Sequence, residues 1–224
     1  MKKIHTLSIL DRSGSMSSYK ARTIESFNAD LASLREQAKS AGVKVYNTLL
    51  TFASNNNWSA SDESDFRFSR VLADVSDCPD LTAEEYTPNG GTPLLDAIGK
   101  GIERLKTELG DDLGSDDVHI LVTILTDGEE NSSRSYTKDQ IKKMIEHFSA
   151  DGKWTFTFIG CGSIDNVTAT SAGLGVSSTN TVAFAATDQG YTSAYTSMRS
   201  CRSSYVSAVA TNTLSSTKLF DDNK

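Results

Sequence analysis

Short apolar runs alternate along the chain with stretches in which apolar residues recur at helical spacing. The segment HTLSIL (5–10) is a run of the first kind, and residues 19–38 follow the second pattern, with apolar positions at Ile24, Phe27, Leu31 and Leu34. The first pattern predicts a strand and the second an amphipathic helix. Gly42 follows the helical stretch and predicts its carboxyl end. The chain therefore begins as strand, loop and helix.

The same alternation continues through the rest of the sequence. Further apolar runs predict strands at 43–53, 66–75, 118–128, 154–160 and 180–186. Helical periodicity predicts a short helix that ends at Gly173 and a long one over 189–209, whose apolar stripe contains Tyr191, Tyr195, Met198, Cys201 and Tyr205. We interpret that stripe as core packing.

Two helix starts are predicted from capping residues. Thr92 followed by Pro93 is typical of an N-cap and a first helical position. The buried stripe expected after them is Leu94, Leu95, Ile98, Ile102 and Leu105. Thr137 and Gln140 have the spacing of a capping box, which predicts a third helix.

Strands that alternate with helices predict an α/β fold with a mostly parallel open sheet between two helical layers. The strand over 66–75 is expected to form a hairpin with the preceding strand and to lie antiparallel at the sheet edge. With 224 residues the chain fits one domain. We assign 1–186 to the α/β domain, 187–210 to a carboxyl-terminal helix packed on it, and 211–224 to a polar tail.

Composition narrows the possible partners and the cellular compartment. The formal net charge of −7 argues against nucleic-acid binding, which depends on clustered Lys and Arg. No run approaches the roughly 18 apolar residues of a membrane span, and Asp11 interrupts the first apolar stretch before a signal-peptide core forms. Cys78, Cys161 and Cys201 show no CxxC spacing, which favours reduced thiols. We therefore expect a cytoplasmic protein with neither nucleic-acid nor membrane partners.

Oxygen-bearing side chains gather where the predicted strands end. ILDRSGSMSS (9–18) places Asp11, Ser13 and Ser15 in the first loop, Thr92 lies before a helix, and Asp127 ends a central strand. In parallel sheets, ligands bind beyond the carboxyl ends of the strands. Carboxylate and hydroxyl oxygens suit a hard cation such as Mg²⁺. If the carboxylates act through water, the ion keeps positive charge and an open position, which favours an Asp or Glu from a partner.

Phosphate chemistry fits these loops poorly. DRSGSM lacks the lysine of a Walker loop, and GCGSID (160–165) lacks the last glycine of a dinucleotide fingerprint. An aspartyl-phosphate enzyme needs a second carboxylate two positions after Asp11, where this chain has Ser13. We therefore expect no enzyme activity, and we keep a metal-assisted phosphohydrolase as a less favoured alternative.

Each candidate residue also has a purely structural interpretation. The Asp-x-Ser-x-Ser stretch and Thr92 can cap helices, and Asp127 can belong to a TDG turn. Glu129 and Glu130 are interpreted as a solvated rim and are left out of the ligand set. The three histidines, His5, His119 and His147, have no metal-ligand spacing and are taken as structural.

DRSGSMSS, GGTPLLDAI and LVTILTDGEEN resemble, in this order, the three segments of the metal-ion-dependent adhesion site (MIDAS) of von Willebrand factor type A (vWA) domains. The resemblance covers about residues 4–186, and the carboxyl-terminal third also resembles small standalone bacterial and phage members. It implies a Rossmann-like open sheet with one Mg²⁺ or Mn²⁺. It further implies direct ligation by Ser13, Ser15 and Thr92, with Asp11 and Asp127 acting mainly through water and hydrogen bonds.

The resulting hypothesis is a divalent-metal-dependent protein–protein interaction module that binds an acidic residue of a partner through the ion. A second possibility is a homo-oligomeric scaffold in which a neighbouring copy fills the metal site, with an acidic residue of the tail FDDNK (220–224) as a candidate. Leu214, Leu219 and Phe220 are the possible anchors of that tail.

Overall fold

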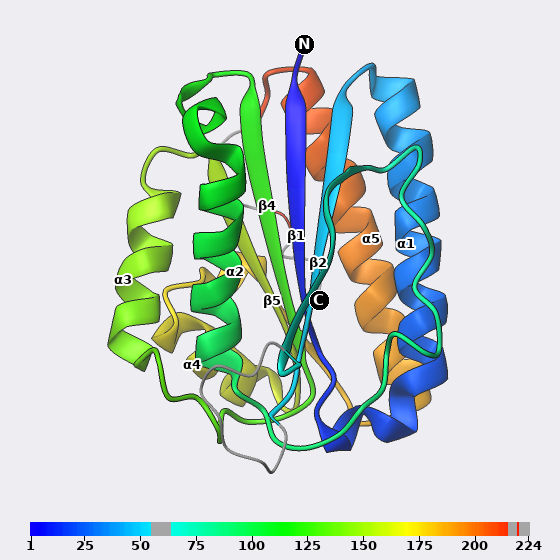
Figure 1. The fold of residues 1–224 in the computed structure, drawn as a ribbon, viewed down its shortest axis with the longest axis vertical. Helices are drawn as coiled ribbons and strands as arrows, with labels where there is room; N and C mark the ends of the chain where they lie inside the picture. Colours follow the sequence, from blue (N-terminus) through cyan, green and yellow to red (C-terminus); the bar gives the residue numbers. More distant parts are fainter. Residues whose placement is uncertain (55–63, 215–218, 220–224) are drawn as a thin grey trace.

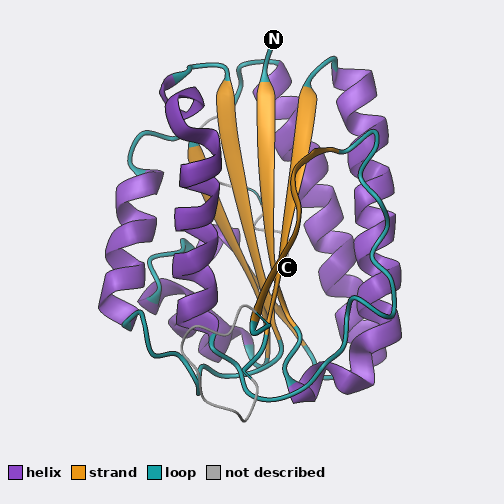
Figure 2. Ribbon diagram, in the orientation of Figure 1, coloured by secondary structure: helices purple, strands orange, loops and turns teal. Residues whose placement is uncertain are grey.

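A six-stranded sheet forms the middle layer of the fold (Figures 1 and 2). The computed structural model describes residues 1–54, 64–214 and 219. The strand order is β3-β2-β1-β4-β5-β6. The strands are β1 (Lys3–Asp11), β2 (Lys44–Phe52), β3 (Phe66–Asp74), β4 (Val118–Thr126), β5 (Trp154–Cys161) and β6 (Thr181–Phe184). All neighbours pair in parallel except β2 and β3, so the predicted three-layer fold with one antiparallel edge strand is confirmed.

Helices cover both faces of the sheet (Figure 1). On one face lie α1 (Lys20–Ala41) and α5 (Asp188–Ala210), and on the other lie α2 (Leu94–Leu109), α3 (Lys138–Ser149) and α4 (Ile164–Gly173). Short 3₁₀ turns precede α1 (η1, Gly14–Tyr19), follow α2 (η2, Gly110–Gly114) and precede β6 (η3, Ser178–Asn180).

The central strands are buried on both faces, as their near-continuous apolar runs indicate. Successive residues of a strand point to opposite faces. Ile9 therefore packs with α2 and α3, whereas its neighbour Leu10 packs with α1 and α5. In register, Ile9 lies beside Leu50 of β2 and Ile124 of β4.

Two of the three helix termini that were predicted from capping residues are confirmed. Gly42 ends α1 in the left-handed region at φ 66°, and Thr137 forms the predicted capping box with Gln140. The predicted start of α2 is wrong, because Pro93 is the N-cap and Thr92 lies in the loop before it. Thr92 is held there by both its backbone groups, which pair with Asn131. Leu95, predicted to be buried, is only half-buried.

The edge strand β3 departs from regular pairing. Arg70 and Leu72 have φ angles of 55° and 49°, and the register with β2 shifts between Asn47 and Leu49. The Arg70 guanidinium forms two hydrogen bonds of 3.0 Å to the Glu85 carboxylate. It also donates to two backbone carbonyls, at Pro79 and Asp80, so β3 and the long loop after it are fixed to each other.

The carboxyl-terminal helix α5 packs beside α1 (Figure 1). Its predicted stripe, from Tyr191 to Tyr205, is buried. Leu214 and Leu219 pack against the same core, and the Leu219 N–H donates to Asn180 Oδ1 at 3.3 Å. Phe220 and the other residues of the predicted tail at 215–218 and 221–224 lie outside the described residues.

The described helices are too short or too polar to cross a bilayer. The three cysteine thiols are free, with Cys78 and Cys201 buried and Cys161 half-buried.

Candidate metal site

Asp11 is fixed at the end of β1 by protein donors on both carboxylate oxygens. The Ser13 N–H donates to Oδ1 at 2.7 Å, and the Thr126 hydroxyl donates to Oδ2 at 2.6 Å. The side chain is fully buried, and this burial raises the pKa of Asp11 to about 6, although both hydrogen bonds oppose the rise. With a protein donor on each oxygen, Asp11 fixes the orientation of the loop after β1, and each oxygen keeps a second lone pair for water.

Two serine hydroxyls and a carboxylate converge beyond Asp11. Ser13 Oγ and Ser15 Oγ are 3.0 Å apart, and the Ser15 hydroxyl donates to Asp127 Oδ1 at 2.7 Å. Burial raises the pKa of Asp127, while the hydrogen bond from Ser15 lowers it. Ser13 is buried but Ser15 is exposed, so the group opens to solvent at the carboxyl edge of the sheet.

Thr92 reaches this group because its loop is bonded to the loop after β1. The Gly14 N–H donates to the Gly90 carbonyl, and the Asn89 N–H donates to the Arg12 carbonyl, both at 2.9 Å. A methyl group placed on Gly128 would lie 3.2 Å from Thr92 Oγ1 and 3.7 Å from Ser15 Oγ. These two hydroxyls therefore face the same small space, which Gly128 leaves open. The structure thus brings together all five predicted residues, Asp11, Ser13, Ser15, Thr92 and Asp127.

The residues that position Thr92 were not predicted from the sequence. Asn131 accepts from the Thr92 N–H at 2.8 Å through Oδ1, and its own N–H donates to the Thr92 carbonyl at 3.2 Å. Gly91 permits this approach, because a Cβ at that position would come within 2.8 Å of Asn131 Oδ1 and 2.3 Å of Ser132 Oγ.

Two carboxylates strengthen the junction between the start of α2 and the segment after β4. Glu130 accepts from the Leu95 N–H at the start of α2, at 2.9 Å, and from two N–H groups and a hydroxyl of Ser132 and Ser133. Asp96 accepts three backbone N–H groups, those of Arg134, Ser135 and Tyr136, at 2.8–2.9 Å. The interpretation of Glu130 as a solvated rim residue is therefore wrong, whereas Glu129 is exposed as expected. An acidic residue at the third position of a helix is a signal that could have identified Asp96.

This donor set fits a hard divalent cation. Oxygens bound to Mg²⁺ at about 2.1 Å and at right angles lie about 3.0 Å apart, which matches the separation of the two serine oxygens. A hydroxyl can donate its proton to a carboxylate while its lone pair faces a metal, so the bond from Ser15 to Asp127 is compatible with ligation.

The histidine side chains lie away from this group of residues. Within the described part of the chain, no cluster of three or more His, Cys, Asp or Glu side chains is placed to hold a metal. His5 and His119 lie on β1 and β4 near their amino ends, at the opposite edge of the sheet, and His147 lies on α3.

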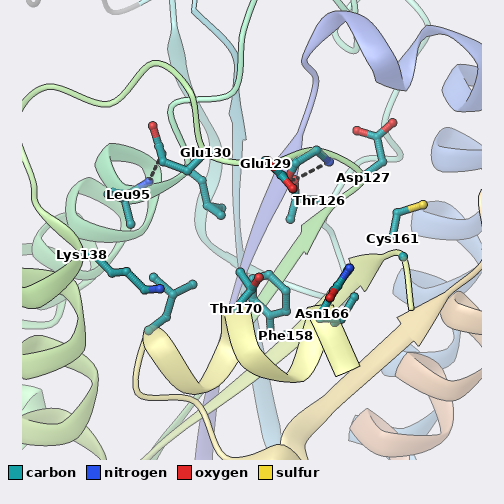
Figure 3. A pocket seen from close by; sticks show the side chains of 16 residues that line it. Leu95, Thr126, Asp127, Glu129, Glu130, Lys138, Phe158, Cys161, Asn166 and Thr170 are labelled. Carbon is teal, nitrogen blue, oxygen red and sulfur yellow. Dashed lines mark hydrogen bonds between the residues drawn. The ribbon is translucent and has the colours of Figure 1, made fainter. Parts of the chain in front are cut away.

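A pocket of about 580 Å³ lies beside the five residues (Figure 3). Asp127 belongs to both, and its neighbour Gly128 also lines the pocket. It is bounded by the starts of α2 and α3, by α4, and by the ends of β4 and β5. Figure 3 shows Asp127 and Cys161 on one side and Leu95 and Lys138 on the other.

Comparison with known proteins identifies the fold but no close relative. No protein-family model matches the chain, and no curated protein matches its sequence. The pilus adhesin SpaC of Lactobacillus rhamnosus GG is similar with a TM-score of 0.59 and 12% identity, over 96% of this chain and 30% of the adhesin. Proximal thread matrix protein 1 of the mussel byssus is similar with a TM-score of 0.53 and 13% identity, over 93% of this chain and 47% of that protein.

A third similar structure is an isolated domain of comparable length. The VWA domain of SpRpn10 aligns with a TM-score of 0.51 and 11% identity, over 88% of this chain and 95% of that domain. This chain spans less than half of the two longer proteins. The strand order and the solved structures together show that the chain has the fold of a von Willebrand factor type A domain.

Proposed function

We propose that the protein is a divalent-metal-dependent protein–protein interaction module. Ser13, Ser15 and Thr92 would hold an Mg²⁺ or Mn²⁺ ion directly, with Asp11 and Asp127 acting through water and hydrogen bonds. The observation that carries the proposal is the convergence of two serine oxygens, 3.0 Å apart, with Asp127 at an exposed edge of the sheet.

The charge of this donor set favours an acidic partner. The three hydroxyls are neutral, and the Asp11 carboxylate already accepts two protein hydrogen bonds. A bound divalent ion would therefore keep part of its charge and an open position towards solvent. An Asp or Glu side chain of a partner supplies the missing negative charge and the missing oxygen, and a second copy of the chain could supply it in a homo-oligomer.

We propose a binding role rather than catalysis because this group lacks the second carboxylate that an aspartyl-phosphate enzyme needs two positions after its nucleophile. Ser13 occupies the position where an aspartyl-phosphate enzyme has its acid–base carboxylate. Thr126 and Ser13 hold both oxygens of Asp11, which leaves that carboxylate poorly placed for nucleophilic attack.

Titration calorimetry with Mg²⁺ and Mn²⁺ tests the site. The variant Ser13→Ala/Ser15→Ala should lose about 100-fold or more in metal affinity, because two direct ligands are removed. Ser18→Ala is the matched control, since Ser18 is an exposed serine of the same 3₁₀ turn outside the proposed ligand set, and it should bind like the wild type.

Acetate serves as the simplest partner carboxylate in the same experiment. Metal binding by the wild type should tighten when acetate is present, and the double variant should show no such effect. Equal metal binding by the wild type and the double variant would refute the site. Metal binding that acetate leaves unchanged would refute the carboxylate bridge.

A further inference from the structure

The pocket beside the proposed metal site has an apolar floor. Leu94 from α2, Phe158 from β5, and Val167 and Leu174 from α4 line it, and each is at most 4% exposed as a residue. Leu95 adds a half-buried apolar side chain on the α2 side. A volume of about 580 Å³ lies in the range of pockets that enclose ligands, roughly 300–1,000 Å³.

Polar groups occupy the margins of this pocket. Asp127 and Glu129 lie at the side of the metal site, and the Glu130 carboxylate is engaged by backbone N–H groups. Lys138 extends towards α4, where its Nζ lies 2.4 Å from the position of a Cβ on Gly173. The carboxylates near the metal side would repel a second acidic group, so the floor is best matched by an uncharged, apolar side chain.

One exposed apolar residue, Ile164, lies near the pocket lining in the sequence. Among the described residues, the exposed large hydrophobic side chains are Met1 and Ile164, and Ile164 is 57% exposed. Ile164 begins α4, and Gly162 and Asn166 on either side of it line the pocket.

We infer that the partner segment carries a large apolar side chain within about two residues of the carboxylate that binds the metal, and that this side chain fills the pocket. The inference rests on the proposed function. The spacing follows because Asp127 belongs to the proposed metal site and also lines the pocket. Consecutive Cα atoms are about 3.8 Å apart, so an extended segment passes from the site to the pocket within a few residues.

Five synthetic peptides test this inference. The reference is an acetylated, amidated peptide with one Glu flanked by two glycines on each side, and the other four replace one glycine at a time by Phe. Affinities are measured by calorimetry in excess Mg²⁺ and again in EDTA. At least one Phe peptide should bind about tenfold or more tightly than the reference in Mg²⁺, because an aromatic side chain is buried.

Variants on α4 test whether the tighter binding of a Phe peptide depends on the pocket. Thr170 and Asn166 are exposed residues that line it, so Thr170→Trp and Asn166→Trp should each fill it and remove the advantage of the Phe peptide. Ala169→Trp is the matched control, since Ala169 is exposed on the same helix outside the pocket lining, and it should keep the advantage.

The outcomes separate the inference from the function on which it rests. Mg²⁺-dependent binding of the reference peptide with no gain from any Phe would overturn the inference and leave the proposed function intact. A gain that persists in both filled-pocket variants would also overturn it. Absence of Mg²⁺-dependent binding by every peptide would reject the proposed function, and the inference with it.

Discussion

Burial changes the chemistry of single side chains at both ends of β1. At the carboxyl end, Asp11 has a raised pKa and uses both oxygens to hold Ser13 and Thr126. Near the amino end, the His5 ring stacks on Tyr46 with centroids 4.9 Å apart, and within the described structure neither ring nitrogen has a hydrogen-bond partner. Burial lowers the pKa of His5 to about 4, and the nearby Lys3 ammonium adds to this effect.

The free energy of unfolding should therefore depend on pH through His5. The unfolded chain takes up a proton near pH 6.5 and the folded protein only near pH 4, so stability is lost as the pH falls between these values. We expect a loss on the order of 2–3 kcal/mol over this window. His5→Phe keeps a ring beside Tyr46 and removes the titrating group.

Urea unfolding at several pH values from 7 to 4 measures this effect as the difference between wild type and His5→Phe. The difference cancels the contributions of Asp11 and Asp127, whose raised pKa values act in the opposite direction. A difference that stays constant across the window would show that His5 does not titrate as its burial implies.

At the scale of elements, the start of α2 and the segment after β4 hold each other by reciprocal bonds. Glu130 and the Ser133 hydroxyl accept from the first N–H groups of α2, at Leu95 and Asp96. In return the Asp96 carboxylate accepts from the backbone of 134–136. This junction places Thr92 near Asp127. Thr92 precedes α2, and Asp127 and Asn131 both belong to the segment after β4.

Asp96→Ala should destabilise the fold by about 2–4 kcal/mol, because three backbone N–H groups lose a charged acceptor. Asp139→Ala is the matched control, as an acidic residue in the first turn of α3 that is exposed, and it should cost less than about 1 kcal/mol. Urea unfolding of both variants tests this, and equal losses would show that the Asp96 bonds contribute little.

Local patterns predict the elements of this fold better than their junctions. The strands, the capping box at Thr137 and the αL end at Gly42 depend on neighbouring residues, and all are found as predicted. The position of Thr92 before α2 depends on its bond to Asn131, which is nearly forty positions away, so neighbouring residues do not predict where α2 begins.

The same distinction holds for the candidate site. The five oxygen-bearing residues could be selected because they follow strand ends or precede a helix. The residues that support them could not be selected in this way, because they act between segments that are distant in the sequence. These residues are Asn131, Glu130 and Asp96. The irregular β3 is a further case, because the conformation of Arg70 accompanies contacts with Glu85 in a separate loop.

For the whole molecule, a buried ion pair joins α1 and α5 on one face of the sheet. The Arg202 guanidinium contacts Asp30 of α1 and donates to Ser8 Oγ of β1 at 2.9 Å. Both charged residues are at most 2% exposed. Among the described residues, Asp30 Oδ1 and Arg202 Nε have no hydrogen-bond partner, so the pair is incompletely satisfied.

Asp30→Ala should destabilise the protein by about 3–5 kcal/mol, because it leaves a buried guanidinium without its counter-charge. The double variant Asp30→Leu/Arg202→Met should recover most of that loss, since apolar side chains of similar size need no hydrogen-bond partners. Urea unfolding of the single and double variants measures both values. A double variant as unstable as Asp30→Ala would show that the pair itself is strongly stabilising.

The left-handed residues of β3 also affect how copies of this protein meet at high concentration. A regular edge strand exposes a row of unpaired N–H and C=O groups on which another chain can add, which is a common start of fibril growth. Here Arg70 and Leu72 turn the backbone out of that pattern, and the register shift interrupts it further. At the other edge β6 has only four residues. Both edges of the sheet are therefore poor templates for the addition of a strand from another copy.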